Sequence, residues 1–237
     1  MSEHTSKNST KNVIIFALVL SVICSLMIAG AAGGLKKFQT ANMETDKKTN
    51  ILRAAGLISG KKPSRQAVNR LYDNHIREVT VNRNGKIIDH EIPGSLNLYF
   101  YQKKGMIKGY IIPINTKGLW GKIQGYLAFD NDGQTIAGFT VFSHSETPGL
   151  GGEIESAWFQ KNFKGKKILN SHNKFVSVKI AKGSTANLPA DLRDHYVDGI
   201  SGATLTGRYL TEGIRNALVK YDSVSVLFRQ KKLTATK

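Results

Sequence analysis

The sequence predicts an α+β protein, in which one N-terminal transmembrane helix is followed by a single soluble domain with an antiparallel sheet flanked by helices. Three observations predict this class. An uncharged apolar segment lies near the N-terminus, a series of short strand-like runs follows it, and apolar residues recur at helical spacing on either side of those runs. About two hundred residues follow the apolar segment, which is enough for one domain with its own core.

Residues 13–35 form the predicted transmembrane helix. No charged residue occurs from Val13 to Leu35, and the segment is long enough to cross a hydrocarbon core of about 30 Å. A cleaved signal peptide is the alternative, because Ala29-Gly30-Ala31 imitates a cleavage site. The run exceeds the usual signal core of about 7–15 residues, so a retained anchor is preferred. Cys24 is the only cysteine, which excludes disulfides and thiol-ligated metal clusters.

Two helices and a polar loop are expected between the anchor and the first strand. Thr45–Leu57 carries apolar residues on one face and has Gly56 near its end, which is typical of a helix terminus. Lys61–Arg65 reads as a loop, and Gln66–Tyr72 reads as a second short helix. The predicted organisation is therefore a short tail (1–12), the transmembrane helix (13–35), a helical linker (36–60) and a cofactor domain (61–237).

Five strand-like runs form the centre of the chain. Their residues are Glu78–Val81, Leu96–Gln102, Ile107–Ile114, Ile123–Phe129 and Ile136–Phe142. Turn signals separate them at Asn84-Gly85, Lys104-Gly105 and Asn131-Asp132-Gly133. The last of these turns predicts an antiparallel hairpin that joins the final two strands.

The C-terminal third is predicted to contain helices and one more strand. Glu153–Phe163 has plausible helical spacing, and Phe175–Ile180 resembles another strand. Leu205–Tyr221 is predicted as a helix, and Val224–Leu233 as a continuation of the helical region. Thr204 would then lie at or near a helix N-terminus, where exposed amides and the helix dipole favour an anion.

The segment from Asp198 to Thr204 carries the first chemical pattern. It places two hydroxyls around a Gly-Ala step of minimal bulk, so that a large molecule could reach the backbone and Thr204. A tight turn with a helix N-cap is the bland interpretation. The segment resembles the flavinylation motif Asp-x-x-Ser/Thr-Gly-Ala-Thr of the FMN-binding domain of bacterial respiratory complexes. The resemblance implies that the phosphate of FMN is esterified to Thr204, with Ser201, Gly202, Ala203 and Asp198 around it.

A second cluster lies about fifty residues upstream, at His144–Ile154. Its glycines expose backbone N–H groups that could bind the polar edge of a flavin or its phosphate, and an ordinary glycine-rich connection is the alternative. The cluster resembles the His-x-Glu-Thr-Pro-Gly-Leu-Gly segment of the same domain family. The residues that this resemblance assigns to the cofactor are Glu146, Thr147, Gly149, Leu150 and Gly151.

Most of the chain resembles the C-type subunit of the sodium-translocating NADH:quinone reductases. Beside the two motifs, the matching parts are Asn50–Leu57, Gly118–Gly121 and the single apolar segment. The resemblance implies one covalent FMN, attached from FAD by a separate flavin transferase, and an electron relay among the other subunits toward quinone. The G-type subunit of the Rnf complexes shares both motifs and is the alternative within redox chemistry. A cofactor-free, membrane-anchored assembly module is the alternative from another class.

Composition narrows the remaining possibilities. The formal net charge is +17, but the anchor and the lack of a basic–aromatic stripe argue against nucleic acid, and the charge suits lipid headgroups or acidic subunits. No Gly-x-Gly-x-x-Gly fingerprint follows a strand, so NADH is expected to be oxidised elsewhere. No metal site is expected. A membrane-tethered hydrolase that uses the hydroxyl of Ser201 or Thr204 is ranked last, because the sequence offers no His–acid pair for either residue.

The position of the soluble domain relative to the membrane is predicted differently by charge and by resemblance. Lys36, Lys37, Lys47 and Lys48 follow the anchor, which favours a cytoplasmic domain by the positive-inside rule. The family resemblance implies the bacterial inner membrane with the domain on the periplasmic side, and this assignment is preferred because an exported transferase attaches the flavin in the family that the chain resembles.

Three further side chains are candidates near a flavin by residue type. Trp158 and Tyr126 could stack on its ring, although such aromatics are more often core residues. His144 could donate a proton, although a structural role in its loop is the more common one.

Overall fold

The computed structural model describes residues 10–60 and 63–233, so residues 1–9 of the predicted tail and Lys61 and Lys62 of the predicted loop lie outside the described residues. The chain separates into two units, Met1–Glu44 and Thr45–Lys237. The finer boundaries expected at residues 12, 35 and 60 stay predictions.

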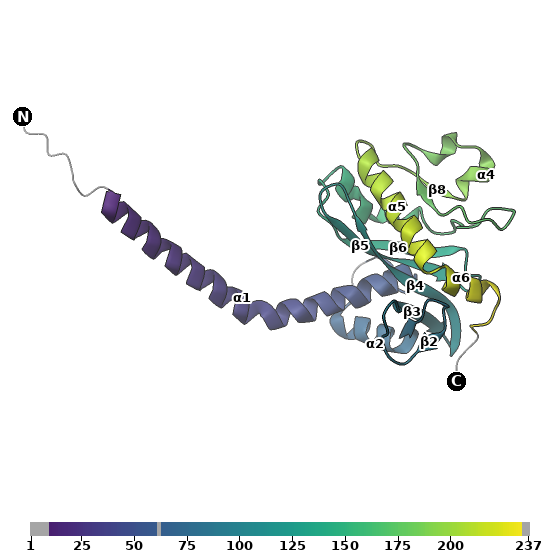
Figure 1. Ribbon diagram of the computed structural model, residues 1–237, viewed down its shortest axis with the longest axis horizontal. Helices are drawn as coiled ribbons and strands as arrows, with labels where there is room; N and C mark the ends of the chain where they lie inside the picture. Colours follow the sequence, from purple (N-terminus) through teal and green to yellow (C-terminus); the bar gives the residue numbers. More distant parts are fainter. Residues whose placement is uncertain (1–9, 61–62, 234–237) are drawn as a thin grey trace, which may run out of the picture. The chain divides into compact units, whose positions relative to one another are not determined.

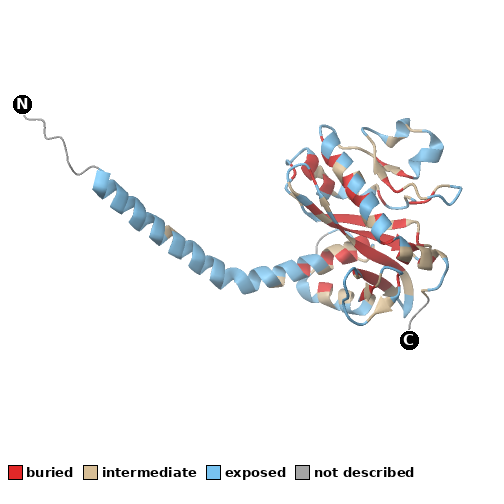
Figure 2. Ribbon diagram, viewed as in Figure 1, coloured by how far each residue is buried: buried red, intermediate tan, exposed pale blue. Residues whose placement is uncertain are grey.

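The first unit consists of the N-terminal part of helix α1 (Thr10–Ala54). Its apolar side chains are exposed along the segment, among them Phe16 and Ile28 at 68% and 70% (Figure 2). The helix is long and apolar enough to cross a membrane, with a mean hydropathy of 2.8 over an 18-residue stretch. The anchor and the helix expected from Thr45 are one continuous helix, because no proline interrupts residues 36–54.

The C-terminal part of α1 belongs to the second unit and ends at a glycine. Gly56 adopts φ +69°, a left-handed conformation that favours glycine, and its N–H donates to the carbonyl of Arg53. The N–H of Leu57 donates to the carbonyl of Leu52. These bonds satisfy the last carbonyls of the helix and turn the chain toward α2 (Arg65–His75), whose N-cap is Ser64.

A six-stranded antiparallel sheet forms the centre of the second unit (Figure 1). Its order is β2-β1-β3-β4-β5-β6. The strands are β1 (Ile76–Val81), β2 (Ile87–Ile88), β3 (Leu96–Lys103), β4 (Met106–Lys117), β5 (Lys122–Asp130) and β6 (Ile136–Ser143). The five predicted runs are therefore strands, β2 is an addition, and Gly133 at φ +68° forms the expected turn between β5 and β6.

Both faces of the sheet are buried, because apolar side chains alternate across the strands. On β4, Ile111 packs with the cluster that includes Ile51 of α1, whereas Tyr110 and Ile112 pack with the cluster on the other face. That second cluster includes Leu210 and residues of two C-terminal helices, α5 (Thr204–Lys220) and α6 (Asp222–Arg229). The observed class is α+β, as predicted.

Close backbone contact fixes α5 on the sheet. A Cβ built at Gly213 would come within 2.1 Å of Thr116 Oγ1 on β4, so only glycine allows this approach. Two residues earlier in the helix, α5 is tied to a small parallel pair, β7 (Lys179–Ile180) and β8 (Tyr196–Val197), because the N–H of Ile180 donates to Thr211 Oγ1 at 3.0 Å. The middle of α5 is thereby held by two separate contacts, one with β4 and one with β7.

Two expected elements differ in the structure. The helix predicted at Glu153–Phe163 is a 3-10 turn, η1 (Gly151–Glu155), followed by α3 (Ala157–Lys161), because Ser156 between them is extended. The strand predicted at Phe175–Ile180 is reduced to β7, because Ser177 adopts φ +65° and cannot continue a strand. Two shorter elements, η2 (Thr185–Asn187) and α4 (Ala190–Arg193), precede β8, and the helical tail ends at Arg229.

Buried tyrosines predict a loss of stability at high pH. Burial raises the pKa of Tyr221 to about 12 and raises the pKa values of five other tyrosines further; these are Tyr72, Tyr99, Tyr101, Tyr110 and Tyr126. The folded state therefore holds these protons more tightly, and its stability is retained below about pH 10 and falls as the pH rises through the folded pKa values. Urea midpoints measured across this range should fall above about pH 10, and tyrosinate absorbance should rise over the same range as the midpoints fall. Tyrosinate absorbance that rises near pH 10 while the midpoint stays constant would contradict this assignment.

Candidate functional site

The structure brings the two sequence motifs together at the N-terminus of α5. A Cβ built at Gly202 would lie 2.7 Å from Leu150 Cδ2, and one built at Gly151 would lie 2.5 Å from Thr206 Oγ1. Residues about fifty positions apart in the chain are thus in direct contact, and the approach at Gly151, where a Cβ would also lie 2.9 Å from Glu146 Oε2, requires glycine. At Gly202 it is the backbone that favours glycine, because φ is +73°.

The turn before α5 presents the candidate acceptor. Thr204 is the first residue of the helix and is exposed, as are Ser201 and Gly202, whereas Ala203 is 6% exposed. Ala203 occupies the N-cap position and makes no side-chain capping bond. The hydroxyl of Thr204 therefore lies at a helix N-terminus that no side chain caps, which is the placement predicted from the sequence.

Glu146 connects three segments of the site. Its side chain is 4% exposed; Oε2 accepts from Thr206 Oγ1 at 2.5 Å, and Oε1 accepts from the N–H of Trp120 at 3.1 Å. A Cβ at Gly118 would lie too close to Oε1, so the loop between β4 and β5 also requires a glycine here. Both carboxylate oxygens of Glu146 are used within the protein, which makes it a positioning residue for α5 and for Trp120.

The glycine-rich loop uses part of its backbone internally. The N–H groups of Leu150 and Gly152 both donate to the carbonyl of Thr147. The sequence predicts that the glycines of this loop expose their amides, and for Gly152 that prediction is wrong, because the loop closes into a tight turn. Gly149 at φ +72° allows this turn, and the side chain of Leu150 remains 43% exposed.

His144 orients this loop. Its Nδ1 accepts from the N–H of Glu146 at 3.1 Å, and its Nε2 lies 3.2 Å from Glu155 Oε2. Both ring nitrogens are thus engaged with residues of the same loop. This arrangement is a structural role, the more common one for a histidine in such a loop.

The aromatic candidates are divided between core and surface. Tyr126 is 5% exposed and packs in the cluster on the α1 face of the sheet, where it stacks on Phe142 at 5.3 Å. Trp158 is 47% exposed on α3. Trp120, which the sequence indicates only as part of a family match, is 70% exposed and is tied through its backbone to Glu146. An aromatic residue between Gly118 and Gly121 was the available clue to this position.

Comparisons with known proteins agree with this arrangement. A sequence-family model described as FMN-binding domain matches residues 118–219, a range that includes both motifs. The C-type subunit of the Na(+)-translocating NADH-quinone reductase of Pasteurella multocida is 30% identical over 243 residues, covering 90% of this chain and 89% of the relative. Its counterpart of the same name from Yersinia pestis is 31% identical over 244 residues, covering 90% and 88%. The chain belongs to the C-type subunit family of the Na(+)-translocating NADH-quinone reductases.

Solved structures of this family share the fold. The crystal structure of the family member from Parabacteroides distasonis superposes with a TM-score of 0.69 at 32% identity, covering 81% of this chain and 96% of that one. Shewanella oneidensis NqrC gives a TM-score of 0.64 at 24% identity, which supports the fold alone. The family assignment confirms the predicted membership of the NADH-quinone reductases over the Rnf alternative.

In this member of the C-type family, Thr204 also lines a cavity of about 280 Å³ beside α5. The cavity lies between the start of α5 and the β7–β8 pair, and its lining includes three basic side chains, Lys179, Lys182 and Arg208. Leu150 and Gly202 contact each other, and neither of them lines this cavity. The turn before α5 therefore meets the glycine-rich loop through Gly202 and lines the basic cavity through Thr204.

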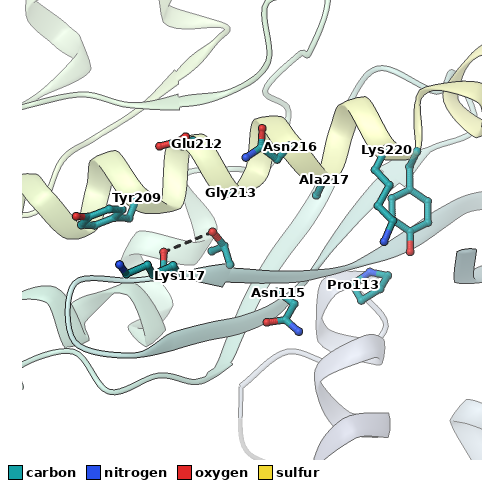
Figure 3. A pocket seen from close by; sticks show the side chains of 11 residues that line it. Pro113, Asn115, Lys117, Tyr209, Glu212, Gly213, Asn216, Ala217 and Lys220 are labelled. Carbon is teal, nitrogen blue, oxygen red and sulfur yellow. Dashed lines mark hydrogen bonds between the residues drawn. The ribbon is translucent and has the colours of Figure 1, made fainter. Parts of the chain in front are cut away.

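A larger groove of about 720 Å³ lies between α5 and β4, further along the helix (Figure 3). Tyr209, Glu212, Asn216 and Lys220 of α5 lie along it, opposite Asn115 of β4. None of the residues assigned to the cofactor lines it, so it is separate from the candidate site.

Asp198 stabilises the loop beside the site. Its Oδ1 accepts from the N–H of Thr185 at 2.6 Å and from Thr185 Oγ1 at 2.7 Å, and these bonds lower the pKa of Asp198 below its usual value of 3.8. A contribution of this sign is present above pH 3.8 and is lost as the pH falls through the folded pKa. The structure therefore gives Asp198 a local structural role, whether or not a modifying enzyme also reads it.

Replacing Asp198 by Ala is expected to loosen residues 183–188. The two donors of Thr185 lose their acceptor, and because the site is open to water the cost to global stability is at most about 1 kcal/mol. Hydrogen exchange of the Thr185 amide should become faster. Thr185→Val is the matched control, because it keeps the backbone bond and removes only the hydroxyl bond. Equal exchange in Asp198→Ala and the unmodified protein would contradict this role.

Proposed function

We propose that this chain is a membrane-anchored flavoprotein subunit that carries FMN covalently on Thr204 and relays electrons within a sodium-translocating NADH:quinone reductase. Membership of the C-type subunit family and the match to the FMN-binding domain support the function. The observation that carries the attachment site is the exposed hydroxyl of Thr204 at an uncapped helix N-terminus, beside the glycine-rich loop.

The described residues fit FMN at this place. A phosphate ester on Thr204 would face the positive end of α5, which favours an anion. Leu150, Leu205 and Trp120 are 43%, 50% and 70% exposed, and they offer apolar surface for a flavin ring. Ser201, Gly202 and Ala203 would hold the backbone close to the phosphate, while Thr147, Gly149 and Gly151 would line the approach.

Bound FMN supplies one- and two-electron transfer, and the protein positions and tunes it. The chain's own contribution is orientation: Glu146 holds Thr206 of α5 and Trp120 in fixed relation, and His144 holds the backbone of Glu146. The other subunits of the complex would be the electron partners, and a flavin transferase would act once, during maturation.

The helix α1 supports anchoring in a bacterial inner membrane. We place the soluble domain on the periplasmic side, following the family, although lysines just after the apolar segment favour the opposite side by charge. Labelling of a cysteine introduced at an exposed domain position, in intact cells and in inverted vesicles, decides between the two sides. Labelling from the cytoplasmic side alone would overturn this placement.

Mass spectrometry of the natively produced protein tests the proposed attachment. The peptide that contains Thr204 is expected to carry one FMN phosphoryl group, and the denatured protein is expected to stay yellow after precipitation. A colourless protein with an unmodified Thr204 peptide would favour the alternative, an anchored assembly module without a cofactor.

A further inference from the structure

Strand β6 forms one edge of the central sheet and is covered only in part. At its start, the N–H of Ile136 donates to the carbonyl of Lys166, and the carbonyl of Ile136 accepts from the N–H of Gly165. Further along, the carbonyl of Val141 accepts from Gln160 Nε2 at 3.3 Å, so the peptide groups of Val141 point away from β5. Between these two points lies an outward-facing stretch of strand.

Three backbone groups of this stretch have no hydrogen-bonding partner in the described part of the chain. Residues of an antiparallel strand alternate between its two edges, so the N–H and C=O of Phe139 face outward as those of Val141 do. Among residues 10–60 and 63–233, neither these two groups nor the N–H of Val141 makes a hydrogen bond. Unpaired N–H and C=O groups on an edge are a template for another strand. The opposite edge strand, β2, is only two residues long, which protects that edge from pairing.

The unpaired groups lie in a groove of about 810 Å³ that is lined by residues 137–142 of β6. On one face of the sheet the groove is bordered by the end of α1, where Thr140 Oγ1 donates to the carbonyl of Asn50 at 3.3 Å. On the other face it is bordered by α3, which packs with the opposite core cluster. Phe142 is 38% exposed and offers apolar surface to a side chain of an added strand. None of the residues assigned to the cofactor lines this groove.

The charge around the groove favours an acidic partner. In the part of the chain that the structure describes, three cations line the groove without a carboxylate oxygen within 4.0 Å; these are Arg53, Lys161 and Lys164. Of the two carboxylates that line it, Asp46 and Glu155, the second already lies 3.2 Å from a histidine ring nitrogen. A second copy of this chain, paired edge to edge, would bring the same cations together, which is unfavourable. An acidic segment of a different chain would give them partners.

We propose that an extended, acidic segment of another subunit of the complex adds a strand to the sheet at the edge of β6. The inference rests on the proposed function, because the partner belongs to the reductase complex. The backbone of the added strand supplies the missing partners of Phe139 and Val141, and this pairing depends little on its sequence. The cations beside the groove then select for acidic side chains.

Hydrogen exchange at single-residue resolution tests this proposal, measured on the full-length subunit alone in detergent and on the purified complex. In the subunit alone, the amides of Phe139 and Val141 are expected to exchange fast, whereas the amide of Thr140, which faces β5, exchanges slowly. In the complex we expect the first two amides to slow by about tenfold or more, because both gain a carbonyl partner. Unchanged exchange at Phe139 and Val141 on assembly overturns the proposal, as does slow exchange of both in the dilute subunit alone.

Charge variants test the chemistry of the partner. Lys161→Glu with Lys164→Glu reverses two exposed charges beside the groove and should remove most of the slowing at the two edge amides. Lys86→Glu with Lys103→Glu is the matched control, because it makes the same change of charge at exposed positions outside the groove and should leave the slowing unchanged. Slowing that survives the first pair of substitutions would mean that the partner segment is not acidic, and it overturns the proposal.

Two further readings separate the remaining outcomes. Slowing that appears in the isolated subunit as its concentration rises would assign the edge of β6 to a second copy of the chain, against the proposal. Covalent flavin is measured on the same samples. Absence of flavin from the unmodified complex would refute the proposed attachment alone, whereas fast exchange at the β6 edge in a complex that carries flavin would refute only the added strand.

Discussion

Replacing Thr204 by Val is expected to abolish covalent FMN completely. Valine keeps the β-branched shape of threonine but has no oxygen that could form the phosphate ester. Thr204 is exposed and makes no side-chain capping bond, so the fold should be retained and the unfolding free energy should change by less than about 0.5 kcal/mol. In-gel flavin fluorescence after denaturation, together with the intact mass, measures the loss, and a melting curve measures the fold.

Ser201→Ala is the matched control for this variant. Ser201 is a second exposed hydroxyl, located three residues before Thr204 in the same turn. The alanine variant should keep its flavin at full stoichiometry if Thr204 is the acceptor. Flavin retained in Thr204→Val and lost in Ser201→Ala would assign the ester to the other hydroxyl, and flavin retained in both would place it elsewhere.

The sheet and the start of α5 could be predicted from the sequence, because both are encoded locally. Alternating apolar residues and Gly-containing turns specified the five main strands, and apolar spacing after Thr204 specified the helix that begins there. The two motifs could be related to one site only through a family resemblance. Their physical contact, between Leu150 and Gly202, depends on tertiary structure.

The irregular parts could not be predicted, because single backbone conformations decide them. Ser177 takes a left-handed φ of 65° while it is 1% exposed, and nothing in its sequence neighbourhood indicates this. An isolated glutamate in a polar loop is also expected to be exposed. Glu146 is buried because its hydrogen-bonding partners come from other elements, one of them 60 residues away in the chain.

Replacing Glu146 by Leu is expected to cost about 2–4 kcal/mol of unfolding free energy. The hydroxyl of Thr206 would lose its acceptor in a buried place and the N–H of Trp120 in a part-buried one, and leucine offers neither a replacement. The loop at residues 144–151 and the first turn of α5 should loosen together. Urea unfolding gives the energy, and hydrogen exchange at Thr206 gives the location.

Glu146→Gln separates hydrogen bonding from shape and charge. The amide oxygen of glutamine still accepts from the N–H of Trp120, and its amide nitrogen donates to Thr206 Oγ1, so most of the stability should be kept. Thr206→Val removes the same bond from the other side. Because Glu146→Leu and Thr206→Val break one shared interaction, the double variant should cost less than the sum of the two single variants by about 1 kcal/mol or more. Strict additivity of the two unfolding free energies would mean that Glu146 and Thr206 stabilise α5 independently. In that case Glu146 would not be the residue that holds Thr206, and it would not position the turn that carries Thr204.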